Sequence, residues 1–132
     1  MQAFRGGSAR RNGMLAARID HLGDRVSVRA ARELIASGGF HHDASTTPAR
    51  WLERHMGITR REAQRLARVA GLLDAMPALG AAFASGEVRL GHLDAIARIV
   101  PSRVRGEDRD AMLEALRECA AELITAAAGC DV

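Results

Sequence analysis

The stretch from Trp51 to Leu73 constrains the fold most, because it carries the apolar periodicity of two helices separated by one turn signal. Gly57 stands where the C-terminus of a helix often needs a left-handed residue, and Thr59 and Glu62 have the spacing of a capping box. We therefore predict a helix-turn-helix-like unit at about 51–73. The apolar residues of its second helix recur at steps of three and four, as on a buried helix face: Ala63, Leu66, Ala67, Ala70 and Leu73.

The remaining chain shows the same helical periodicity. Only 3% of the residues are aromatic, so the core must consist mainly of alanine and branched aliphatic side chains. Apolar residues at helical spacing favour an all-α fold, and we predict a single helical bundle of six or seven helices. The predicted domain covers residues 13–127 and is followed by a tail at 128–132. Residues 1–12 are rich in Gly, Ser and Arg, so we expect them to be disordered.

Local signals set several helix boundaries. Gly23 and Asp24 should break a first helix that starts near Met14, and Ser27 should cap a second one. Thr47 and Pro48 have the pattern of an N-cap and a first helical residue for the helix that contains Trp51. We expect Trp51 to be buried. One long final helix is predicted at about 107–127.

The second helix of the Trp51–Leu73 stretch has an arginine-rich outer face. Arg61, Arg65 and Arg68 recur at helical spacing opposite the apolar stripe, and Arg60 lies beside them. Residues 1–73 contain 13 arginines against 6 acidic residues, a net charge of +7, whereas residues 74–132 carry −4. Such a helix is suited to contact the phosphates of DNA. The alternative is a solvated surface helix whose arginines only maintain solubility.

The histidines and cysteines do not form a recognisable catalytic or metal site. His41 and His42 are adjacent in a polar loop without a nearby cysteine, so we predict solvated side chains and no bound metal. His92 is expected to be a half-buried structural imidazole. Cys119 and Cys130 are expected to be reduced thiols of a cytoplasmic protein. No apolar run approaches transmembrane length, so we predict no membrane partner.

The predicted final helix has an acidic ridge at four-residue steps, formed by Asp110, Glu114, Glu118 and Glu122. This ridge is most simply a solvated face. It is also suited to dock a protein partner or a second copy of the chain. Pairing of the ridge with Arg61, Arg65 and Arg68 would argue against DNA on the arginine face.

The middle of the chain resembles a known protein family. A Trp-Leu helix is followed by a Gly-Ile-Thr-Arg-Arg-Glu-Ala turn, an arginine-rich helix, a Met-Pro pair, a small-residue helix ending in Gly-Glu and a helix containing histidine. This succession resembles domain-of-unknown-function family 222, the 13E12-repeat family of actinobacteria and their phages, over about residues 14–125. The matching positions are Asp43, Trp51, Leu52, Gly57, Thr59, Arg61, Glu62, Ala63, Pro77, Gly86, Glu87 and His92.

The resemblance implies a helical module of the kind that precedes a C-terminal HNH endonuclease domain. The metal-binding histidine and the His/Asn base region of an HNH site are absent from this sequence, so we expect no catalytic residues and no cofactor. The sequence also has Arg89 where the family often carries a capping serine, which puts that cap in question.

We therefore predict a non-catalytic module that binds DNA, or positions an HNH nuclease domain on DNA. The phosphate contacts are assigned to Arg60, Arg61, Arg65 and Arg68, and structural roles to Trp51, Thr59 and Glu62. The alternatives are a protein-interaction or homo-oligomerisation module without a nucleic-acid role, and a truncated fragment of an HNH endonuclease.

Overall fold

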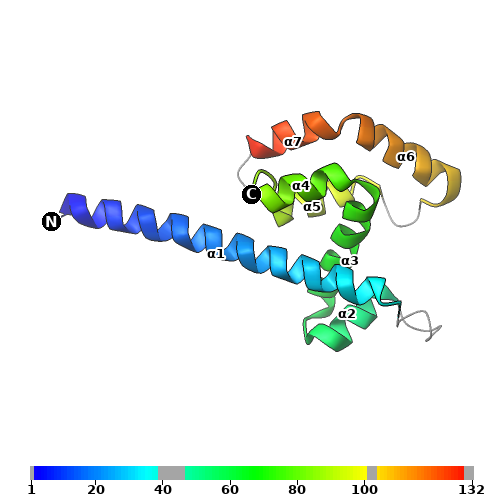
Figure 1. Ribbon diagram of the computed structural model, residues 1–132, viewed down its shortest axis with the longest axis horizontal. Coiled ribbons are helices and arrows are strands. Elements are labelled where there is room, and N and C mark those ends of the chain that lie inside the picture. The colour runs from blue at the N-terminus through cyan, green and yellow to red at the C-terminus, as the bar shows by residue number, and fades with distance from the viewer. Residues whose placement is uncertain (1, 39–46, 101–103, 130–132) are drawn as a thin grey trace.

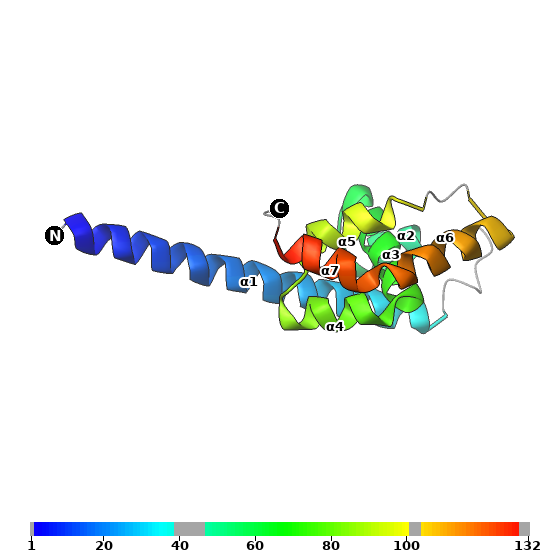
Figure 2. The same ribbon diagram turned by 90° about the horizontal axis from the view of Figure 1, so that it is seen from above.

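The computed structural model describes residues 2–38, 47–100 and 104–129, and every regular element in these ranges is an α-helix. The described helices form the bundle shown in Figures 1 and 2, which confirms the predicted all-α fold of six or seven helices. In chain order they are α1 (Gln2–Ala36), α2 (Pro48–Met56), α3 (Arg60–Ala75), α4 (Pro77–Ser85), α5 (Leu90–Ala97), α6 (Gly106–Glu118) and α7 (Ala120–Ala128).

Helix α1 is one continuous helix of 35 residues. Residues 2–12, which we expected to be disordered, form its first turns, and the predicted break at Gly23 and Asp24 is wrong. A glycine inside a helix costs only about 1 kcal/mol relative to alanine. The burial of Val28 and Ala31, which are 3% and 0% exposed, holds the C-terminal half of α1 against the other helices. Ser27, predicted to be a cap, consequently lies in the middle of the helix.

The α2–α3 unit has the predicted N-caps at Thr47 and Thr59, but only half of the predicted capping box, because the Glu62 carboxylate lies beside Arg65 and makes no hydrogen bond back to the Thr59 N–H. The hydroxyl of Thr47 accepts a hydrogen bond from the backbone N–H of Arg50 at 3.2 Å, and α2 ends at Gly57 in the left-handed conformation with φ 63°. The hydroxyl of Thr59 accepts from the N–H of Glu62, also at 3.2 Å, and α3 begins at the next residue. The helix-turn-helix-like unit predicted at about 51–73 is therefore confirmed.

Helices α4 and α5 follow local signals at most of their ends. Pro77 is the first residue of α4, and Gly86 ends that helix with φ 86°. At the start of α5, the Nδ1 atom of His92 accepts a hydrogen bond from the backbone N–H of Arg89 at 3.0 Å. This histidine satisfies the N–H of Arg89 itself, whereas a capping serine would accept from an N–H inside the helix, and Arg89 makes no such side-chain cap.

The predicted single helix at 107–127 is wrong, because the chain changes direction at Cys119 and forms α6 and α7. The bend lets Leu116 on one side and Leu123 and Ile124 on the other pack against the same core. In Figure 1 α7 lies above α4, and α6 extends beyond the end of α4. The packing of apolar side chains therefore decides this boundary, for which the sequence has no glycine or proline.

Helix α3 is the centre of the bundle and contacts α1, α2, α4 and α5. Its apolar face is buried as predicted at Ala63, Leu66, Ala70 and Leu73, and Ala67 packs against this core. Trp51 is only half-buried, so the prediction of a buried tryptophan is wrong. The fully buried residue of α2 is its neighbour Leu52, at 0% exposure. The indole ring instead lies against His55, one turn later, with 4.0 Å between ring centroids.

Candidate nucleic-acid interface

The first turn of α3 faces solvent. Arg60, Arg61 and Gln64 are exposed, and the Thr59 cap holds the end of the helix in place. Among the residues that the structure describes, no carboxylate lies within ion-pair distance of Arg60 or Arg61. Both guanidinium groups are thus exposed and unpaired within the described part of the chain.

Helix α2 adds basic side chains that the sequence analysis did not assign to the interface. Arg50 and Arg54 are exposed one turn apart on α2. Arg50, Glu53, Arg60 and Gln64 line a hollow of about 390 Å³ between α2 and α3, so two cations there face one carboxylate. The four-residue spacing of Arg50 and Arg54 was the signal in the sequence, because residues at this spacing share a helix face.

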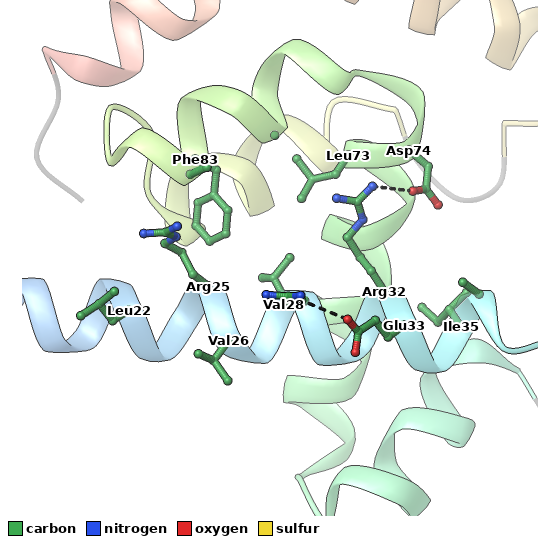
Figure 3. Close-up of a pocket in the computed structure, with 14 residues that line it drawn as sticks. Leu22, Arg25, Val26, Val28, Arg32, Glu33, Ile35, Leu73, Asp74 and Phe83 are labelled. Atoms are coloured by element: carbon green, nitrogen blue, oxygen red, sulfur yellow. Dashed lines mark hydrogen bonds and ion pairs between the residues drawn. The ribbon is translucent and has the colours of Figure 1, made fainter.

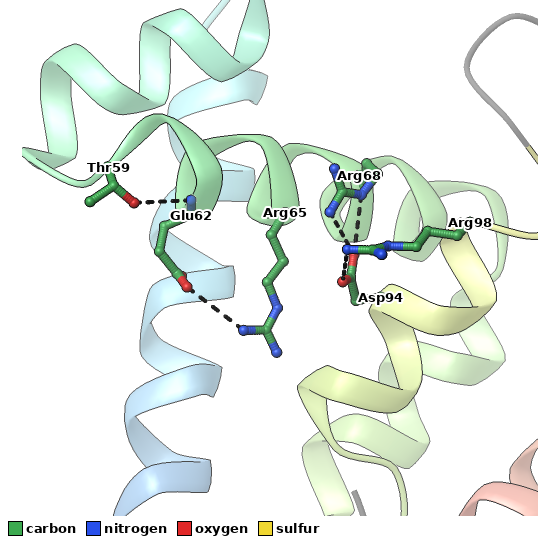
Figure 4. Close-up of polar contacts among 6 residues, drawn as sticks. All are labelled: Thr59, Glu62, Arg65, Arg68, Asp94 and Arg98. Carbon is green, nitrogen blue, oxygen red and sulfur yellow. Dashed lines mark hydrogen bonds and ion pairs between the residues drawn. The ribbon is translucent and has the colours of Figure 1, made fainter.

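Arg68 is engaged inside the protein. Its Nε and Nη2 atoms donate hydrogen bonds to Oδ1 of Asp94 at 3.1 and 3.0 Å, as Figure 4 shows. The other oxygen of Asp94 lies 3.0 Å from Nη2 of Arg98. The carboxylate is largely buried, so it joins α3 to α5 while neutralising one of the two cations. The charge that Arg68 could offer to a phosphate is therefore already offset by a carboxylate of the protein.

Arg65 is also partly withdrawn from solvent. Its side chain is 32% exposed, and its Nη1 atom lies 3.7 Å from Oε1 of Glu62 (Figure 4). It lines a groove with Asp20 and Asp24 of α1 and with His92 of α5. Burial raises the pKa of the Asp24 carboxyl, and the charge of Arg65 partly opposes this rise. Arg65 thus points toward carboxylates of the protein itself.

The four predicted phosphate-binding arginines consequently divide into two pairs. Arg60 and Arg61 are exposed, whereas Arg65 and Arg68 have carboxylate neighbours within the fold. The partner of Arg68 is Asp94 and not the acidic ridge of the last helices. Within that ridge, Glu114 lies 2.8 Å from Arg117 of its own helix.

The described histidines have structural contacts. His21 is 8% exposed, and its Nε2 atom donates a hydrogen bond to the carbonyl oxygen of Phe83 at 3.0 Å. His92 is half-buried as predicted and caps α5. Among residues 2–38, 47–100 and 104–129, no three His, Cys, Asp or Glu side chains are grouped to hold a metal ion. The predictions for His41 and His42 lie outside the described residues.

Cys119 is an exposed free thiol at the bend between α6 and α7. Its pKa is raised by desolvation and by the carboxylates of Glu122 and Glu118. A raised pKa lowers the thiolate fraction of this side chain. Cys130 lies outside the described residues.

No family model, no curated protein and no solved structure matches this chain. The resemblance to family 222 therefore depends on the motif residues named above.

None of the described helices has by itself the length and apolar character needed to cross a membrane. Helices α3 and α4 meet these criteria only as a pair, bent by 115° at their junction. Both helices contribute buried side chains to the core of the bundle, among them Leu66 and Leu79.

Proposed function

We propose that this chain is a non-catalytic helical module that binds the phosphates of DNA at the exposed end of its α2–α3 unit. The observation that supports this most directly is the pair Arg60 and Arg61, which is exposed and has no carboxylate partner among the described residues. Guanidinium groups match phosphate geometry and remain charged at any physiological pH. Arg50, which lines the same hollow as Arg60, supplies a third contact.

The charge distribution supports the same surface. Residues 1–73, which contain α1, α2 and most of α3, carry a net charge of +7, against −4 for residues 74–132. An uneven distribution of this kind attracts and orients a polyanion before any contact forms. The α2–α3 unit belongs to the positive half.

The four predicted arginines contribute unequally to the proposed phosphate contact. Arg60 and Arg61 make the main contacts, with help from Arg50. Arg65 and Arg68 contribute less, because each is partly buried and has a carboxylate of the protein beside it that offsets its charge. The resemblance to family 222 adds a biological context, in which such a module positions an HNH nuclease domain on DNA.

The binding should be weak and nearly independent of sequence. Phosphate contacts do not distinguish base pairs, and on α3 only Gln64 offers an exposed amide suited to an adenine edge. Three phosphate contacts predict a slope of about −2.7 for the logarithm of affinity against the logarithm of salt concentration. The expected dissociation constant is on the order of micromolar or weaker at physiological salt.

The test is the salt dependence of duplex DNA binding, measured by fluorescence anisotropy. The double variant Arg60→Ala/Arg61→Ala should flatten the slope by about 1.8. The control Arg105→Ala/Arg109→Ala removes the same charge from the start of α6 and should change the slope much less. Equal slopes for the two double variants would show that the first turn of α3 is not the contact surface.

The alternative function is a protein-interaction or oligomerisation module without a nucleic-acid role. The observation that favours it is a set of exposed aliphatic side chains on α1, including Leu15, Ile19, Leu22 and Val26. A chain that oligomerises but shows no salt-dependent retention on DNA would support this alternative.

A further inference from the structure

Helix α1 has an exposed apolar stripe with regular spacing. Leu15, Ile19, Leu22 and Val26 are 49%, 67%, 53% and 68% exposed. Successive members are four, three and four residues apart, which is the seam spacing of a left-handed coiled coil. Single exposed aliphatic residues are common on protein surfaces, but a contiguous stripe at this spacing marks an interaction surface.

The stripe lies mainly on the side of α1 opposite its buried face, and its members Leu22 and Val26 also line the groove between α1 and α4. The buried face of α1 consists of His21, Val28 and Ala31, and at 100° per residue it lies on roughly the opposite side of the helix. Figure 3 shows Val26 pointing away from Phe83 and Leu73, which stand across the groove between α1 and α4. The N-terminal part of α1 projects beyond the other helices in Figures 1 and 2.

We propose that this stripe is the seam of a homodimer, in which α1 pairs in parallel with α1 of a second copy. In heptad terms Leu15 and Leu22 occupy d positions, and Ile19 and Val26 occupy a positions. Leucine at d combined with β-branched residues at a favours two parallel strands. A two-fold axis along the seam brings each side chain against its own counterpart, so one stripe is complementary to itself.

The residues beside the seam select the parallel orientation. Arg18 and Arg25 occupy g positions, whereas the e positions hold the small residues Ala16, Gly23 and Ala30. In a parallel pair, Arg18 lies opposite Gly23 of the second copy, and Arg25 lies opposite Ala30. In an antiparallel pair, g positions face each other, and Arg18 would meet Arg25 with like charge.

The seam is short, so the dimer should be reversible. Arg29 and Glu33 take the next d and a positions and form an ion pair within their own helix at 3.2 Å. The apolar seam therefore ends at Val26 after two heptads. Such a contact buries less than the roughly 1,200 Å² of a standard stable interface, and we expect a dissociation constant on the order of 10 µM.

Sedimentation equilibrium of the full chain without DNA tests the proposal. From about 1 to about 500 µM, the average mass should rise from 14.1 kDa toward twice that value. Ile19→Glu should weaken the dimer at least tenfold. The matched control is Ile99→Glu, because Ile99 is 49% exposed but lies outside α1, and it should dimerise like the parent chain. A parent chain that stays monomeric throughout, or an Ile19→Glu variant that dimerises normally, would overturn the proposal.

Disulfide trapping tests the orientation in a background with Cys119→Ser and Cys130→Ser. In the parallel register, Ile19→Cys meets its own counterpart and should cross-link under mild oxidation. Asp20→Cys is the control, because the next position leaves the seam. Cross-linking through Asp20→Cys but not Ile19→Cys would refute this register. Because these experiments contain no DNA, their failure leaves the DNA-binding proposal unaffected.

Discussion

Replacing Asp94 by asparagine tests whether the α3–α5 connection depends on a charged carboxylate. Asp94 accepts two hydrogen bonds from Arg68 at 3.1 and 3.0 Å, and its other oxygen lies 3.0 Å from Arg98. Asparagine keeps the size of the side chain and one acceptor oxygen. It removes the negative charge and places an amide donor where an oxygen had accepted.

The magnitude follows from the exposure of each partner. The side chain of Asp94 is 13% exposed and that of Arg68 is 36% exposed, so their interaction is only partly screened by solvent. A hydrogen bond to a charged group contributes about 1.5–3 kcal/mol, and Arg68 recovers part of this by hydration. The Arg98 side chain is 64% exposed, so its contact adds less than about 1 kcal/mol. We expect Asp94→Asn to lower the free energy of unfolding by about 2 kcal/mol.

Urea unfolding followed by circular dichroism measures this loss, and a shift of about 6 °C in Tm should accompany it. The matched control is Asp74→Asn. Asp74 also lies 3.0 Å from an arginine, Arg32, but its side chain is 67% exposed. The control should cost less than about 0.5 kcal/mol. Equal losses for the two variants would refute the argument that burial decides the strength of these pairs.

The same variant bears on the candidate interface. Asp94→Asn frees Arg68 from its counterion and removes one negative charge from the protein. If Arg68 can then reach a phosphate, the salt slope for DNA binding should steepen by up to about 0.9. An unchanged slope, with Arg60→Ala/Arg61→Ala still effective, would restrict the contact surface to the first turn of α3.

Three further predictions concern the helices that carry the site. Leu52→Ala should lower the free energy of unfolding by about 3–4 kcal/mol in urea titrations, whereas half-buried Trp51→Ala should cost roughly half as much. Thr59→Ala removes the N-cap of α3 and should cost about 1 kcal/mol, while Thr59→Ser should restore most of the loss. The raised pKa of Asp24 means that the folded chain binds a proton more tightly than the unfolded chain. Protonated Asp24 therefore stabilises the fold below the unfolded pKa of 3.8, and this stabilisation is lost as pH rises through the folded pKa. Urea midpoints measured against pH should show this loss in the parent chain. The loss should be absent in Asp24→Asn, which has no carboxyl group to titrate.

The sequence predicted best those features that depend on neighbouring residues. The hydroxyl caps of Thr47 and Thr59 and the turn at Gly57 each involve groups within four positions, and the structure has them as expected, although the Glu62 half of the capping box is not formed. The continuity of α1 through Gly23 and the division of α6 from α7 depend on distant packing instead. Val28 and Ala31 carry α1 through Gly23, and the bend at Cys119 follows the shape of the core.

The candidate site shows the same division between local and distant information. The spacing of Arg61, Arg65 and Arg68 placed them in one row on α3. That row is not clear of the buried face, because Val69, four residues after Arg65, and Leu72, four residues after Arg68, are buried as well. The spacing did not reveal which of them would be free, because the carboxylate that engages Arg68 belongs to Asp94, 26 residues later on another helix. Charged residues at helical spacing therefore identify one face of a helix. Whether each of them can bind a partner outside the protein depends on the oppositely charged groups that the tertiary fold brings next to it. This is why the structure shifts the proposed phosphate contacts toward Arg60 and Arg61, and why Asp94→Asn is expected to shift them back toward Arg68.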